Sequence, residues 1–140
     1  LTRVTELDLL LERADIVSLQ CPLTDQTRRL MGEAQFRKMK KSAWLINTAR
    51  GEVVDEEALI AALSTGEIAA AGLDTFSKEP PGDLSRLRDA GKTVLSPHVG
   101  GITEESFERM GVDAVRNILT VLEGRKPARN CMINPEIFDR

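Results

Sequence analysis

Three side chains in this 140-residue sequence could together act on a small carboxylic acid: Arg50, Glu79 and the only histidine, His98. The planar guanidinium of an arginine binds a carboxylate through two parallel hydrogen bonds. An imidazole exchanges a proton near neutral pH, and the carboxylate of Glu79 is a candidate to orient that ring and stabilise its charge. A proton carrier beside a carboxylate-binding group suits 2-keto and 2-hydroxy acids.

Each of these residues follows a segment with the pattern of a buried strand. The predicted strands are short, largely apolar segments at residues 16–19, 43–46, 69–73 and 93–95. Helices are predicted between and after them: a short one carrying Leu7, Leu10 and Leu11 with Thr5 and Asp8 as its cap, then 33–40, 56–64 between Asp55 and Gly66, 84–88, and 103–124.

Strands without alternation, separated by amphipathic helices, indicate an α/β fold with a doubly wound parallel sheet covered on both faces. Ligands of such sheets bind beyond the carboxyl ends of the strands. The sequence therefore predicts that five residues that follow strands converge at one edge: Cys21, Thr48, Arg50, Asp74 and His98.

Each candidate also has an ordinary structural interpretation. Arg50 could be a surface arginine in a turn, and Glu79 a solvated acid before Pro80 and Pro81. His98, between Pro97 and the Gly100–Gly101 pair, could be a structural histidine. Taken together the three favour a site, and the two glycines leave room for a cofactor.

Composition excludes several classes of function. The net charge of −3 and the pI near 5.3 provide no broad basic surface, which argues against a nucleic-acid partner. No apolar run approaches the roughly 20 residues that span a bilayer, so we expect a cytoplasmic protein without a membrane contact. Cys21 and Cys131 lack the spacing of a zinc site, and no metal is implied.

Four motifs in order resemble the D-isomer-specific 2-hydroxyacid dehydrogenase family, which includes phosphoglycerate dehydrogenases and glyoxylate or hydroxypyruvate reductases. They are Ser18–Thr27, Trp44–Asp55, Ala71–Pro81 and Ser96–Glu105. The resemblance implies a Rossmann-type fold of which only the second half of the nucleotide-binding domain is present. Residues 1–124, including the helix 103–124, would belong to that domain, and residues 125–140 would join the substrate domain.

The resemblance also implies residue roles. Arg50 would bind and polarise the substrate, His98 would be the general acid or base, and Glu79 its hydrogen-bonded partner. Asp74 would bind the carboxamide of NAD or NADP. The full set implied for the cofactor is Cys21, Pro22, Thr27, Thr48, Ala49, Arg50, Asp74, His98, Gly100 and Gly101. Gln20 and Thr75 depart from the family pattern, at positions where many relatives have histidine and an apolar residue.

No GxGxxG motif is present. The resemblance therefore implies a C-terminal portion of a longer enzyme, which would be inactive alone and homodimeric at full length. The strand 16–19 would normally pair with the absent first strand, and its bare edge predicts that this chain alone aggregates, dimerises or needs a further portion. An alternative function is a cofactor-sensing module that binds a protein partner, as in the family's transcriptional corepressors. A panel of hydroxy acids discriminates the two.

Overall fold

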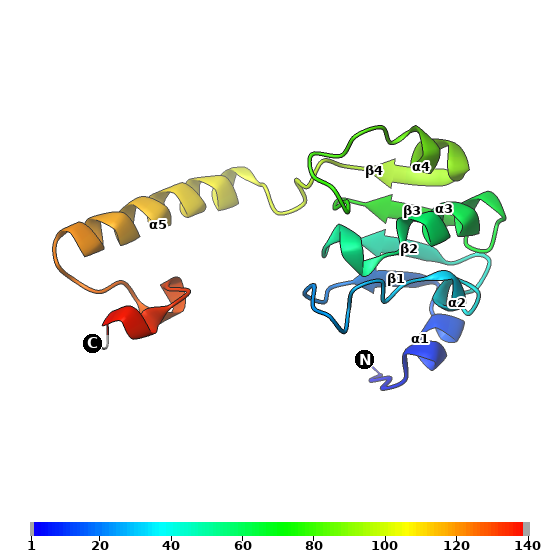
Figure 1. Ribbon diagram of the computed structural model, residues 1–140, viewed down its shortest axis with the longest axis horizontal. Coiled ribbons are helices and arrows are strands. Elements are labelled where there is room, and N and C mark those ends of the chain that lie inside the picture. The colour runs from blue at the N-terminus through cyan, green and yellow to red at the C-terminus, as the bar shows by residue number, and fades with distance from the viewer. Residues whose placement is uncertain (1, 139–140) are drawn as a thin grey trace. The chain divides into compact units, whose positions relative to one another are not determined.

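The computed structural model describes residues 2–138 as two compact units, residues up to Gly100 and Gly101–Arg140. Leu1, at the start of the expected domain, and Asp139 and Arg140, at the end of the expected tail, lie outside the described residues. The first unit contains the four strands and the second contains the long helix (Figure 1). The assignment of residues 103–124 to the nucleotide-binding domain stays a prediction.

The first unit is a four-stranded parallel sheet with the strands side by side in chain order. The strands are β1 (Ile16–Leu19), β2 (Trp44–Asn47), β3 (Ala70–Leu73) and β4 (Lys92–Leu95), and the α-helices are α1 (Leu7–Arg13), α2 (Glu33–Phe36), α3 (Glu56–Ser64) and α4 (Ser85–Ala90). A 3₁₀ turn, η1 (Gly51–Val53), follows β2. The predicted parallel α/β architecture is confirmed, and β1 is an edge strand as expected.

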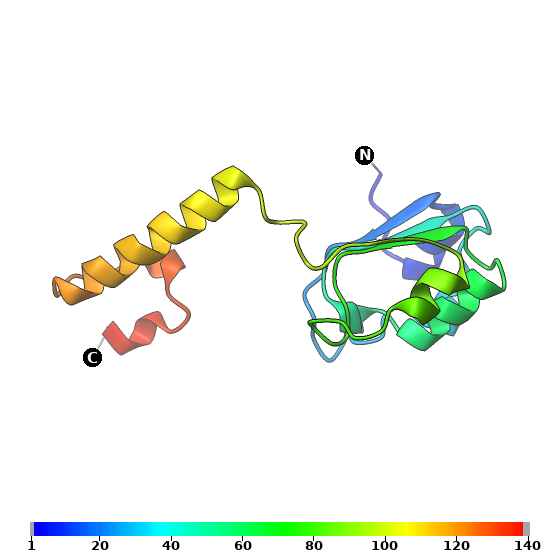
Figure 2. The ribbon, with the colours of Figure 1, turned by 90° about the horizontal axis from the view of Figure 1, so that it is seen from above.

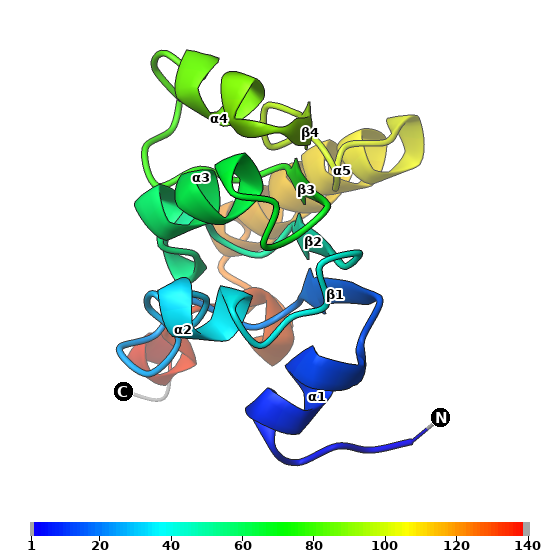
Figure 3. The same cartoon turned by 90° about the vertical axis from the view of Figure 1, so that its right-hand side faces the viewer.

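Helices of this unit cover one face of the sheet only, as Figures 2 and 3 show for α2, α3 and α4. Along β1, Val17 and Leu19 are buried whereas Ile16 is 64% exposed. The prediction of cover on both faces is therefore not met within residues 2–100. On the open face, an apolar groove of about 560 Å³ runs past Trp44 and Val94.

The predicted helices form with altered ends. α1 begins after Glu6, with no side-chain cap, so the predicted cap by Thr5 and Asp8 is wrong. α2 ends at Phe36 rather than residue 40, because the next hydrogen bonds, Lys38 N to Gln35 O (3.1 Å) and Met39 N to Phe36 O (3.0 Å), connect residues three apart. Asp55 caps α3 as predicted, accepting from Ala58 N at 3.2 Å.

The second unit consists of α5 (Glu104–Leu122) and two 3₁₀ turns, η2 (Arg129–Cys131) and η3 (Pro135–Phe138). Both turns lie within the tail 125–140, for which the sequence indicated no regular element. Thr103 opens α5 as predicted, accepting from Ser106 N at 3.2 Å and donating its own N–H to Ser106 Oγ at 2.8 Å. α5 buries none of its residues, and its large apolar side chains, among them Phe107 and Leu122, are exposed.

Thr75, which follows Asp74 in the chain, has a buried hydroxyl with no hydrogen-bond partner among residues 2–138. Its residue is 2% exposed, and burying an unpaired hydroxyl costs about 1–3 kcal/mol. Valine has the same shape without that oxygen. We expect Thr75→Val to raise the free energy of unfolding of the full-length protein by about 1 kcal/mol, measured by urea titration.

Thr65→Val is the matched control, because the exposed Thr65 hydroxyl already donates to Ala61 O at 2.9 Å. It should bring no gain in stability. A Thr75→Val protein that is no more stable than the wild type would show that the hydroxyl is paired in solution.

Candidate active site

The loop that follows β2 is organised from inside the core by Asn47. Leu45 and Asn47 point to the same buried face of the strand because side chains alternate along it. Asn47 is 1% exposed. Its side-chain oxygen accepts from Ala49 N, and its side-chain nitrogen donates to Arg50 O, each at 3.0 Å. The backbone of Arg50 is thereby fixed while its side chain reaches the surface.

The guanidinium of Arg50 has donors available for a ligand. Nη1 donates to the carbonyl of its neighbour Ala49 at 2.6 Å, and no other hydrogen bond of this side chain occurs among residues 2–138. Beside it lies a cleft of about 550 Å³ at the carboxyl ends of β1 and β2, lined by Gln20, Cys21, Pro22, Leu23, Thr48, Ala49 and Arg50. Four of the five N–H groups of the guanidinium are therefore unengaged, and an anion in this cleft could bind to a pair of them.

Gly51 brings this loop against the loop that follows β3. A Cβ at Gly51 would lie 1.9 Å from the carbonyl carbon of Phe76 and 2.3 Å from Ser77 N. Only a residue without a side chain permits such an approach of two backbones. The contact places Arg50 and Glu79 on loops that touch each other.

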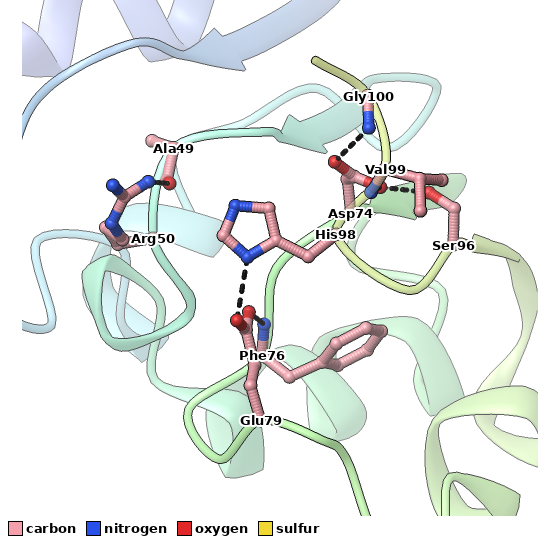
Figure 4. A network of polar contacts seen from close by, with 9 residues as sticks. All are labelled: Ala49, Arg50, Asp74, Phe76, Glu79, Ser96, His98, Val99 and Gly100. Carbon is pink, nitrogen blue, oxygen red and sulfur yellow. Dashed lines mark hydrogen bonds and ion pairs between the residues drawn. The ribbon is translucent and has the colours of Figure 1, made fainter. Parts of the chain in front are cut away.

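His98 and Glu79 form an imidazole–carboxylate pair, with 2.7 Å between His98 Nδ1 and Glu79 Oε2 (Figure 4). The other oxygen of Glu79 accepts from Phe76 N at 3.0 Å. The hydrogen bond from His98, that from Phe76 and the charge of Arg50 lower the pKa of Glu79. Because Glu79 is thus the ionised acceptor, Nδ1 is the donor, and Nε2, across the ring, is the atom that can exchange a proton.

Asp74 is the first residue after β3 and is 6% exposed. Its Oδ1 accepts from Ser96 Oγ at 2.6 Å and from Val99 N at 2.9 Å, and its Oδ2 accepts from Gly100 N at 2.8 Å. These bonds lower the pKa of Asp74, that from Ser96 most of all. The carboxylate is therefore ionised at neutral pH and holds the loop that carries His98.

Acid should weaken this arrangement. A carboxyl whose pKa is lowered by folding stabilises the folded state above its unfolded pKa, and that stability is lost as the pH falls through the folded value. Asp74→Asn replaces one carboxylate oxygen, which accepts hydrogen bonds, by an amide N–H₂, which cannot accept them. At least one of the three donors then loses its acceptor, and we expect the free energy of unfolding of the full-length protein to fall by about 2 kcal/mol at pH 7. The difference from wild type should narrow below about pH 4, as followed by thermal unfolding.

Asp25→Asn is the control, since Asp25 is exposed in a loop. Its unfolding midpoint should follow that of the wild type at every pH. A deficit of Asp74→Asn that stays constant down to pH 3 would show that the charge of Asp74 does not stabilise the fold.

The structure brings the residues implied for the cofactor together in two groups. Five line the cleft beside Arg50, or are Arg50 itself: Cys21, Pro22, Thr48, Ala49 and Arg50. Three lie in the network around Asp74, namely Asp74, His98 and Gly100 (Figure 4). Thr27 is outside the cleft lining but donates to Pro22 O at 2.7 Å. Gly101 belongs to the second unit.

Three residues that organise the site were not among the predicted site residues: Asn47, Gly51 and Ser96. The alternation of side chains along β2 could have indicated Asn47. Residues two positions apart on a strand face the same side, so Asn47 faces the core together with the buried Leu45. No sequence signal marks the partner of Gly51 or of Ser96. Each contact joins loops that are far apart along the chain.

Two negative findings concern the described part of the chain. Residues 2–138 contain no group of three or more His, Cys, Asp or Glu side chains that could hold a metal ion. None of the helices described is long and apolar enough to cross a membrane.

The parallel four-stranded sheet with its connecting helices is Rossmann-like, and its cleft lies at the carboxyl ends of the strands, where nucleotides bind in this class of fold. Residues 1–100 match the sequence model of a protein family, the NAD-binding domain of the D-isomer specific 2-hydroxyacid dehydrogenases. The chain belongs to this family. The predicted family and fold are thereby confirmed.

Individual relatives agree with this membership. The chain is 48% identical over 134 residues to a glyoxylate reductase of Thermofilum pendens and 49% identical over 137 residues to a glyoxylate/hydroxypyruvate reductase B of Escherichia coli. These alignments cover 96% and 98% of this chain but 39% and 42% of the relatives. The chain thus spans about two fifths of the length of the curated relatives it matches.

A solved structure matches the fold as well. It is the NAD-complexed D-isomer specific 2-hydroxyacid dehydrogenase of Lactobacillus delbrueckii ssp. bulgaricus, with a TM-score of 0.80 and 43% identity. The match covers 88% of this chain and 42% of that one.

Proposed function

We propose that the protein to which this chain belongs is an oxidoreductase that transfers a hydride between NAD and a small D-2-hydroxy or 2-keto acid. The observation that carries the proposal is the 2.7 Å contact of His98 with Glu79, on a loop in contact with that of Arg50. Proton transfer and carboxylate binding are what the reduction of a keto acid requires of the protein. The relatives named as glyoxylate and hydroxypyruvate reductases act on such acids.

His98 acts as general acid in reduction and as general base in oxidation. Glu79 remains ionised because its pKa is lowered, so it keeps the Nδ1 proton in place and stabilises the imidazolium. Nε2 gives its proton to the oxygen of the substrate, or takes it back. A positioned acid of this kind contributes roughly 10²–10⁴ in rate.

Arg50 binds the carboxylate of the substrate and polarises its keto oxygen through the N–H groups that the protein leaves unengaged. A guanidinium holds its charge at every working pH and binds in a fixed plane. The substrate is thus oriented before the proton moves, and orientation of this kind lowers the barrier by limiting the motion of the reactants.

The residues present fit a nicotinamide dinucleotide. The cleft beside Arg50 is lined by short side chains, among them Cys21, Thr48 and Ala49, and opens at the carboxyl ends of β1 and β2, where dinucleotides bind in this fold. When bound, the nicotinamide supplies or accepts the hydride. Cys21, Pro22, Thr48 and Ala49 would line its path, Thr27 would hold Pro22, and Asp74, Gly100 and Gly101 would lie beside its ring.

The assembly and the compartment belong to the same proposal. The full-length protein is a homodimer by analogy with the family. Its compartment is the cytoplasm, which agrees with the free thiols Cys21 and Cys131.

Steady-state turnover by the full-length protein tests the proposal. Glyoxylate, hydroxypyruvate and 3-phosphoglycerate are assayed with NAD(H) and, separately, with NADP(H), together with Arg50→Ala. We expect turnover of at least one acid and a KM for that acid raised more than tenfold in the variant. Cofactor-dependent binding of a protein partner without any turnover would instead favour a sensing module, and equal KM values would remove Arg50 from the site.

A further inference from the structure

His98 lies in a backbone conformation that it would not adopt by itself. Its φ is 56°, in the left-handed region where a side chain with a Cβ is disfavoured. Such a residue stays in place only when its surroundings determine the conformation. The side chain of His98 is 45% exposed, so packing around the ring does not provide that constraint.

The constraint on His98 comes from the carboxylate of Asp74. Its three hydrogen bonds bracket the histidine, with Ser96 before it and Val99 and Gly100 after it (Figure 4). Asp74 spans 22 to 26 residues of sequence to make them. The turn is tightened further by the bond from His98 N to Ser96 O, at 3.1 Å.

Asp74 is itself held rigidly, as an anchor must be. Its backbone N–H donates to Asn47 O at 3.0 Å, which continues the pairing of β3 with β2. Ser96 N likewise donates to Leu73 O at 2.9 Å. At Gly100, a Cβ would lie 2.8 Å from Asp74 Oδ2, so the absence of a side chain lets this amide reach the carboxylate.

From these contacts we infer that Asp74 and Ser96 are positioning residues, which hold the turn 96–100 so that the imidazole of His98 meets Glu79. The family resemblance assigns Asp74 to the nicotinamide carboxamide. A carboxylate offers about four acceptor sites, and the turn occupies three of them here. The carboxylate thus acts mainly on the protein's own loop and retains one site for a ligand.

This inference rests on the proposed function for its kinetic consequence, and its test separates the two. Ser96→Ala removes the hydroxyl bond while leaving Asp74, His98 and Glu79 in the chain. In the full-length protein we expect kcat to fall about tenfold, the KM for NADH to change less than twofold, and the pH profile of kcat to shift. Ser96→Thr, which keeps the hydroxyl, should restore both kcat and the profile.

Amide hydrogen exchange provides a readout that needs no turnover. In Ser96→Ala the amides of Val99 and Gly100 should exchange at least tenfold faster, because the acceptor they share loses one of its fixed contacts. Ser64→Ala is the matched control, since Ser64 Oγ donates to Ile60 O at 2.8 Å on α3. It should change neither exchange at 99–100 nor kcat.

The outcomes decide between the ideas. Faster exchange without turnover by the wild type would support the anchored turn and defeat the proposed function. Unchanged exchange at 99–100 would overturn the anchor. A loss of kcat that Ser96→Thr does not restore, or that appears only as a raised KM for NADH, would also overturn it, in favour of a structural or a cofactor-binding role.

Discussion

His98→Gln in the full-length protein should lower kcat for the reduction of its keto acid by about 10²–10⁴-fold. Glutamine fills similar space but cannot carry the proton that Nε2 exchanges. The KM for NADH should change little, because His98 makes its only side-chain hydrogen bond within residues 2–138 to Glu79. Stopped-flow and steady-state rates at saturating cofactor measure this loss.

Glu79→Gln should also lower kcat, because a neutral amide stabilises the imidazolium less than a carboxylate does, and the effect should grow as the pH rises. Lys92→Gln, on the exposed start of β4, is the matched control and should leave kcat unchanged. A His98→Gln enzyme with the wild-type kcat would end the assignment of His98 as general acid.

Gly51→Ala should have the largest effect on stability. The added Cβ would lie 1.9 Å from the carbonyl carbon of Phe76 and 2.3 Å from its oxygen. Backbone atoms cannot rotate away as a side chain can, so the two loops must separate. We expect the free energy of unfolding to fall by about 3 kcal/mol, measured by urea titration of the full-length protein, together with a fall in kcat as Arg50 and Glu79 move apart.

Gly82→Ala is the matched control, since a Cβ at Gly82 would meet no atom within 4 Å and its φ lies outside the left-handed region. It should change stability by less than about 0.5 kcal/mol. If Gly51→Ala proved as stable as Gly82→Ala, the close approach of the loops 47–51 and 74–79 would not exist in solution.

The sequence predicted the elements well because their signals are local. The strand 16–19 and the helix 56–64 form with the predicted bounds, since an apolar run, the Asp55 cap and the stop at Gly66 act within a few residues. The convergence of Arg50, Asp74 and His98 at one edge also followed, because parallel strands present their carboxyl ends together.

What the sequence determined by itself was the order of strands and helices and the residue types at the strand ends. The tertiary structure alone decided which face of the sheet the helices cover, that Asn47 fixes the Arg50 loop, that Gly51 abuts Phe76, and that Ser96 binds Asp74. The physical reason is distance along the chain. A cap or an apolar period is encoded within a few positions, whereas each of these contacts depends on where another loop lies once the sheet has formed.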